Sequence, residues 1–147
     1  MQSAKDEPKF KIHVLREAYT KNFIIGDSNL RTIERKRLDK IGKTHVRTMA
    51  GAKVADVTAS LKTCSARNDV RRIVLHVGGN DVRKHYTTDD LKADFQQLLS
   101  QVKRVFSTVD IAVTALLHRK PVPTSFTNVL NSALGDVCVK NDSGVYS

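Results

Sequence analysis

The stretch "RRIVLHVGGND", residues 71–81, carries the strongest strand pattern in the chain. Its apolar residues are Ile73, Val74, Leu75 and Val77. A continuous apolar run of this kind, stopped by a pair of glycines, is typical of a strand buried on both faces. We therefore expect a buried strand here, with Asn80 and Asp81 just beyond its carboxyl end.

Other segments alternate between strand and helix patterns around this one. Strand patterns occupy 22–26, 44–51 and 109–118, and helical spacing occupies 28–42, 52–64, 87–106 and 124–140. In the helix over 87–106, Thr88 is the expected N-cap, with acidic residues in the first turn. This alternation predicts an α/β fold, a three-layer α/β/α sandwich of flavodoxin-like type with a mostly parallel sheet and right-handed crossovers.

The ends of these strands carry the residues that could perform chemistry. In parallel α/β sheets, ligands bind at the carboxyl ends of the strands. Ser28 follows the first strand, Gly51 the second and Asn80 the third. Acyl transfer needs a nucleophile and donors for the developing oxyanion, and these three positions could supply both.

Each of these residues also has a structural interpretation. Serine is favoured as a helix N-cap, so Ser28 could cap the helix over 28–42. Glycine and asparagine are common in turns, which would explain Gly51 and Asn80. We expect Asp27 and Asp81 to fix local turns.

Three motifs in order resemble the SGNH, or GDSL-type, serine hydrolases. "GDSNL" (26–30) is similar to their first block, "MAGAKVADV" (49–57) to the second and "HVGGND" (76–81) to the third. The resemblance covers about residues 22–140. It implies esterase activity without cofactor or metal on a small ester substrate, with Ser28 as nucleophile and an oxyanion hole formed by Ser28, Gly51 and Asn80.

The chain departs from this family at its carboxyl end. The family places an Asp-x-x-His pair after the fifth strand, and no such pair occurs in this sequence, in which "GVYS" (144–147) begins a strand. The sequence thus predicts a truncated SGNH-like domain over 22–147, with its last strand missing or incomplete and its activity weak or vestigial. His118, after the fourth strand, and His85, after "GGND", are the candidate surrogate bases. We expect His76 to be a buried structural residue within its strand.

The incomplete sheet has consequences for association. An open strand edge invites pairing with a second chain. We expect either a homodimer through that edge or coverage of the edge by residues 9–19. These residues alternate between apolar and polar and lie in the N-terminal segment 1–21.

Composition leaves one alternative function open. The chain has 25 Lys and Arg against 15 Asp and Glu, and its formal charge of +10 favours anionic partners. The alternative is therefore a non-catalytic binding module for nucleic acid, to which a looser resemblance to retroelement-encoded family members contributes. The basic residues are scattered and aromatic residues are 5% of the chain, which disfavours stacking on single strands. No membrane-length apolar run or apolar leader occurs, so we expect a cytoplasmic protein with Cys64 and Cys138 as buried thiols.

Overall fold

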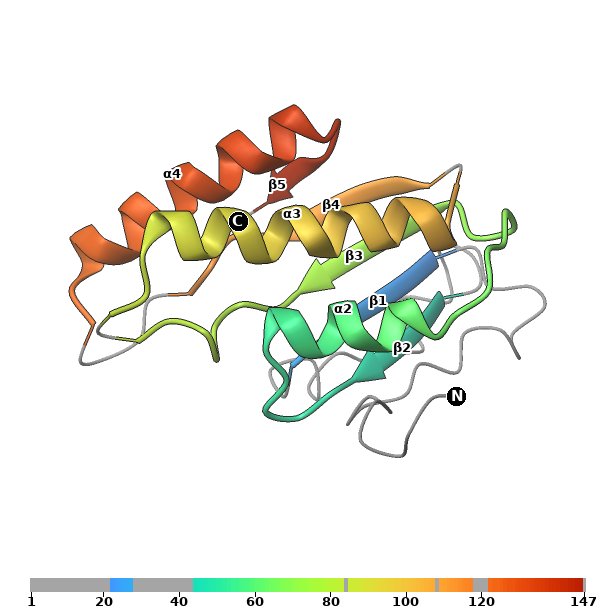
Figure 1. The fold of residues 1–147 in the computed structure, drawn as a ribbon, viewed down its shortest axis with the longest axis horizontal. Coiled ribbons are helices and arrows are strands. Elements are labelled where there is room, and N and C mark those ends of the chain that lie inside the picture. Colours follow the sequence, from blue (N-terminus) through green and yellow to red (C-terminus); the bar gives the residue numbers. More distant parts are fainter. Residues whose placement is uncertain (1–21, 28–43, 84, 108, 118–121, 147) are drawn as a thin grey trace, which may run out of the picture.

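The structure is a computed structural model that describes residues 22–27, 44–83, 85–107, 109–117 and 122–146. Its centre is a parallel sheet of five strands in the order β2-β1-β3-β4-β5 (Figure 1). The strands are β1 (Asn22–Gly26), β2 (Thr44–Thr48), β3 (Arg72–His76), β4 (Asp110–Thr114) and β5 (Gly144–Tyr146). The expected α/β fold with a parallel sheet is confirmed.

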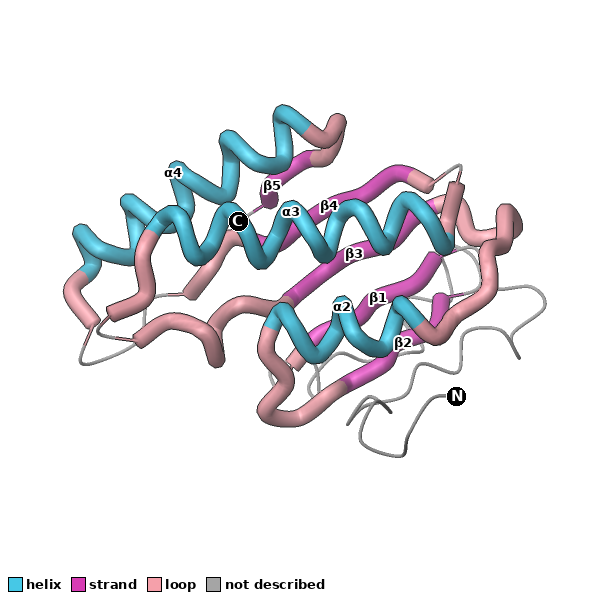
Figure 2. Tube along the Cα trace, viewed as in Figure 1, coloured by secondary structure: helices cyan, strands magenta, loops and turns pink. Residues whose placement is uncertain are grey.

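The described helices cover one face of this sheet. They are α2 (Val54–Lys62), α3 (Thr88–Val105) and α4 (Thr124–Lys140). Figure 2 shows the three helices together in front of the strands. The strand residues that point toward them are almost inaccessible, namely Phe23, Ile25, Ile73, Leu75, Ile111 and Val113. Burial of such side chains supplies the main driving force for folding.

The opposite face of the sheet carries the alternate strand residues. Ile24 pairs in register with Val74, and Val74 pairs with Ala112. All three are only half-buried. The helix predicted over 28–42 lies outside the described residues, so the second helical layer of the predicted sandwich is not among them.

Helix α3 is set by its apolar spacing and by its N-terminal cap. Its buried residues recur every three or four positions: Leu91, Phe95, Leu98, Leu99, Val102 and Val105. Thr87 Oγ1 accepts a hydrogen bond from Asp90 N, and Thr87 N donates to Asp90 Oδ2, both at 3.0 Å. Thr87 is therefore the N-cap, and the prediction of Thr88 was wrong by one residue. Threonine at 87 wins because Asp90 stands three residues later and completes a capping box.

The chain returns to the sheet after α4. Gly144 pairs in register with Ala112, and Tyr146 with Thr114. The strand expected at "GVYS" is thus confirmed as β5, a short edge strand among the described residues. The segment 9–19 lies outside the described residues, and the homodimer stays a prediction.

Two further expectations concern the cysteines and the membrane. Cys64 and Cys138 are free and buried, as predicted. Burial raises the pKa of both thiols, that of Cys138 to about 11, so neither is a reactive thiolate at neutral pH. Among the described helices, none combines the length and apolarity that crossing a bilayer requires.

Candidate active site

The carboxyl ends of β1, β2 and β3 meet at one edge of the sheet. Gly26 is in register with both Thr48 and His76. Just beyond the strands, Met49 N donates to Gly26 O at 2.7 Å, and Asp27 N donates to His76 O at 3.0 Å. The segments that follow these strands therefore start side by side, as the sequence predicts. Ser28 itself lies outside the described residues, and its neighbour Asp27 lies inside them.

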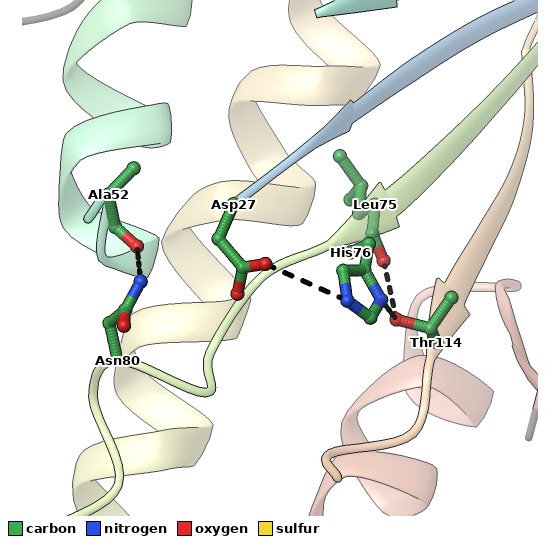
Figure 3. Close-up of polar contacts among 6 residues, drawn as sticks. All are labelled: Asp27, Ala52, Leu75, His76, Asn80 and Thr114. Atoms are coloured by element: carbon green, nitrogen blue, oxygen red, sulfur yellow. Dashed lines mark hydrogen bonds and ion pairs between the residues drawn. The ribbon is translucent and has the colours of Figure 1, made fainter. Parts of the chain in front are cut away.

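The structure brings Asn80 to the loop that contains Gly51. Asn80 Nδ2 donates a hydrogen bond to Ala52 O at 3.0 Å (Figure 3). Gly51 is exposed with φ +74°, a backbone region that glycine adopts without strain. A Cβ built on Gly51 would meet nothing within 4 Å, so the space around this residue is open. The two residues predicted to act as oxyanion donors thus belong to one connected unit.

Asp81 anchors the "GGND" turn to the start of α2. Its carboxylate Oδ2 accepts a hydrogen bond from Val54 N at 3.0 Å, and its side chain is buried. The carboxylate satisfies one of the N–H groups that a helix N-terminus leaves without an intrahelical partner. Asp81 therefore holds two loops of the site together, in keeping with its expected role in fixing a turn.

Burial gives Asp81 a testable effect on stability. Desolvation raises its pKa above the usual 3.8, although the hydrogen bond from Val54 opposes the shift. Between the unfolded pKa and the raised folded pKa, the native state binds more protons. The free energy of unfolding therefore falls as pH rises through that window and levels off above it. We expect Asp81→Asn, whose amide oxygen can still accept from Val54 N, to lose this decline.

The measurement is urea unfolding of wild type and Asp81→Asn at closely spaced pH values from 3 upward. Subtracting the two curves removes the contributions of the other carboxylates. Asp136→Asn, which changes an exposed carboxylate on α4, is the matched control. Parallel curves for wild type and Asp81→Asn would contradict the expectation.

A cluster of Asp27, His76 and Thr114 lies at the same edge of the sheet (Figure 3). His76 Nδ1 is 2.7 Å from Thr114 Oγ1, and Thr114 Oγ1 donates to Leu75 O at 3.4 Å. His76 Nε2 is 3.7 Å from Asp27 Oδ1. Asp27 is buried, whereas 18% of the His76 side chain is exposed.

The position of His76 corrects the sequence prediction. It was expected within its strand as a buried structural residue, and it is instead the last residue of β3, half-buried at the candidate site. The apolar run on both sides of residue 76 concealed it. Period-two alternation from Val74, together with the "GGND" turn that follows, could have placed this side chain at the end of the strand.

His76 and its two polar partners form the polar wall of a pocket. The pocket measures about 270 Å³, counting the solvent at its mouth. Its lining residues are Asp27, His76, Val77, Gly79, Thr114, Ala115, Leu116 and Leu117. The apolar side of the pocket therefore comes from the segments that follow β3 and β4.

The two histidines predicted as surrogate bases have no place in this description of the pocket. His85 is exposed in the turn before α3 and is not among the described residues that line the pocket. His118 lies outside the described residues. Their role as bases stays a prediction that this geometry does not favour.

The parallel sheet, with its candidate site at the carboxyl ends of the strands, has the fold of the SGNH hydrolases. No protein-family model and no curated protein matches the chain by sequence. The likeness is one of structure, at sequence identities that speak for the fold alone. The resemblance drawn from the three motifs is confirmed at that level.

Several solved structures carry this likeness. A Streptococcus pneumonia protein, described as a candidate platelet activating factor, has a TM-score of 0.73 at 16% identity and is matched over 88% of this chain. TesA has a TM-score of 0.67 at 15% identity, over 84% of this chain and 76% of its own. Phospholipase A1 from Streptomyces albidoflavus NA297 has a TM-score of 0.63 at 12% identity, over 87% of this chain and 79% of its own. The chain spans 65% of the length of the Streptococcus protein.

Proposed function

We propose that this chain is an SGNH-type carboxyl-ester hydrolase of low activity, in which Ser28 is the nucleophile. The observation that carries the proposal is the hydrogen bond from Asn80 Nδ2 to Ala52 O. This bond joins the two predicted oxyanion donors at the strand edge from which residue 28 continues. A fold shared with esterases supports the same function.

The proposed reaction begins when Ser28 Oγ attacks the ester carbonyl carbon. The carbonyl oxygen then gains negative charge, which N–H donors at fixed positions stabilise. The Gly51 backbone amide and the Asn80 side-chain amide are the proposed donors, together with the backbone of Ser28. The Ala52 carbonyl fixes the plane of the Asn80 amide before substrate arrives, so little reorganisation is needed during the reaction.

The pocket supports a short acyl group as substrate. Val77, Ala115 and Leu116 give it an apolar side, and its volume of about 270 Å³ lies at the lower end of the range for small-molecule sites. The expected rate is low because the Asp-x-x-His pair is not in the chain. Serine proteases stripped of triad members retain roughly 10³–10⁴-fold catalysis over water, which sets the expected scale.

Substitution of Asn80 by alanine tests the oxyanion hole. Removing one oxyanion donor typically lowers kcat about 10²–10³-fold, and we expect a loss of this order with p-nitrophenyl acetate or butyrate. Asn128→Ala, which changes an exposed asparagine on α4, should hydrolyse the ester at the wild-type rate. Circular dichroism of both variants checks that the fold is retained.

Two results would count against the proposal. One is an Asn80→Ala variant that is folded and as active as wild type. The other is wild-type protein that neither hydrolyses the esters above the buffer rate nor becomes labelled at Ser28 by a fluorophosphonate. In that second case the nucleic-acid-binding alternative would be tested next, by affinity that falls steeply with salt.

A further inference from the structure

The imidazole of His76 faces an oxygen acceptor at each ring nitrogen. On one side, Thr114 Oγ1 lies 2.7 Å from Nδ1 and donates its own hydrogen to Leu75 O at 3.4 Å. On the other side, the buried Asp27 carboxylate lies 3.7 Å from Nε2 (Figure 3). A hydroxyl has only one hydrogen, so a Thr114 hydroxyl that donates to Leu75 must accept from Nδ1–H.

This arrangement suits a histidine that gains a proton at Nε2. With Nδ1 carrying its hydrogen, the lone pair of the neutral ring lies on Nε2. After Nε2 is protonated, the ring is positive and both N–H groups point toward acceptors. The Asp27 carboxylate then stabilises the imidazolium, which is the part that the acidic member of a catalytic triad plays.

We propose that His76 is the general base for Ser28, and this inference rests on the proposed ester hydrolysis. Ser28 Oγ forms a bond to the carbonyl carbon while its proton passes to His76 Nε2. The imidazolium then returns that proton to the ester oxygen of the leaving alcohol as the carbonyl carbon–oxygen bond breaks. Water attacks the acyl-serine in the same way, giving its proton to Nε2, and the proton returns to Ser28 Oγ as the acid leaves.

Chain geometry keeps the two residues close enough for this role. Gly26 is the register partner of His76, and Asp27 N donates to His76 O at 3.0 Å, so residues 27 and 76 are neighbours across the ladder. Ser28 follows Asp27 directly, and consecutive Cα atoms are about 3.8 Å apart. A general base must lie within hydrogen-bond reach of its proton, and such contacts are often longer before substrate binds.

The test is the dependence of kcat/KM on pH for wild type and His76→Gln. Asp27 and His76 are the titratable residues among the described residues that line the pocket. Loss of a general base typically costs about 10²–10⁴-fold, and we expect kcat/KM to fall by that factor. The acidic limb of the wild-type profile, which reports protonation of the base, should disappear in the variant.

Two further variants separate catalysis from packing. His76→Ala leaves space for a small molecule, and added imidazole should restore part of its activity. Thr114→Val preserves side-chain shape but removes the acceptor for Nδ1–H, and it should lower kcat/KM less than His76→Gln while keeping the acidic limb. A purely structural role for His76 predicts neither imidazole rescue nor loss of the limb.

The outcomes distinguish this inference from the proposed function. If His76→Gln keeps the rate and the acidic limb of wild type while Ser28→Ala is inactive, His76 is not the base and the esterase proposal stands. A loss of the expected size in His85→Gln or His118→Gln, with His76→Gln active, would overturn the assignment in the same way. Wild-type protein without turnover, or Ser28→Ala as active as wild type, would overturn both proposals.

Discussion

Replacing Ser28 with alanine is expected to reduce ester hydrolysis to the rate in buffer alone. The alanine side chain has no atom that can form the acyl-enzyme bond, so covalent catalysis ends whatever the base is. The lost factor equals the catalytic advantage of wild type, on the order of 10³–10⁴ if residual triad-free catalysis is the guide. Initial rates with p-nitrophenyl butyrate, corrected for the buffer blank, measure it.

The same variant also tests the competing interpretation of Ser28 as a helix N-cap. Replacing a capping serine by alanine costs roughly 0.5–2 kcal/mol of stability, and a cap has no part in catalysis. A folded Ser28→Ala protein with wild-type turnover and reduced stability would therefore establish the cap and contradict the nucleophile. Ser100→Ala, on the exposed side of α3, controls for the loss of a surface serine.

The sequence predicted the elements of the fold because their patterns are local. Continuous apolar runs ending in glycine became β1 and β3, and three- to four-residue spacing became α3 and α4. The N-cap of α3 was misplaced because threonine occupies both 87 and 88, and only the reach of Asp90 decides between them. The helix over 28–42 lies outside the described residues.

The candidate site could be predicted only where its residues belong to motifs. Gly51 and Asn80 were found this way, and the hydrogen bond from Asn80 to Ala52 places them in one unit. His76 was missed because its meaning depends on Asp27 and Thr114, which come from two other strand ends. Pairings of this kind are set by strand order and register, and hydrophobic pattern alone cannot rank side chains across strands.

Replacing Gly78 with alanine is expected to cause the largest loss of stability of any single substitution considered for this chain. Gly78 has φ +113°, a region that residues with a Cβ rarely adopt. A Cβ there would lie 2.7 Å from Leu116 Cδ2 and 3.2 Å from Phe95 Cζ. Backbone strain of this kind costs about 1–3 kcal/mol, and overpacking a core adds roughly 1–3 kcal/mol. We therefore expect the free energy of unfolding to fall by about 2–5 kcal/mol.

Gly135→Ala supplies the matched control because the same chemical change should act in the opposite direction. Gly135 lies within α4, and a Cβ there would meet nothing within 4 Å. Alanine is favoured over glycine inside a helix by about 0.5–1 kcal/mol, so this variant should be more stable than wild type. Urea unfolding at one pH measures both variants. Equal stabilities for Gly78→Ala and wild type would show that the "GGND" turn relaxes to admit a side chain, and Asn80 would then lack the rigid support that the proposed oxyanion hole requires.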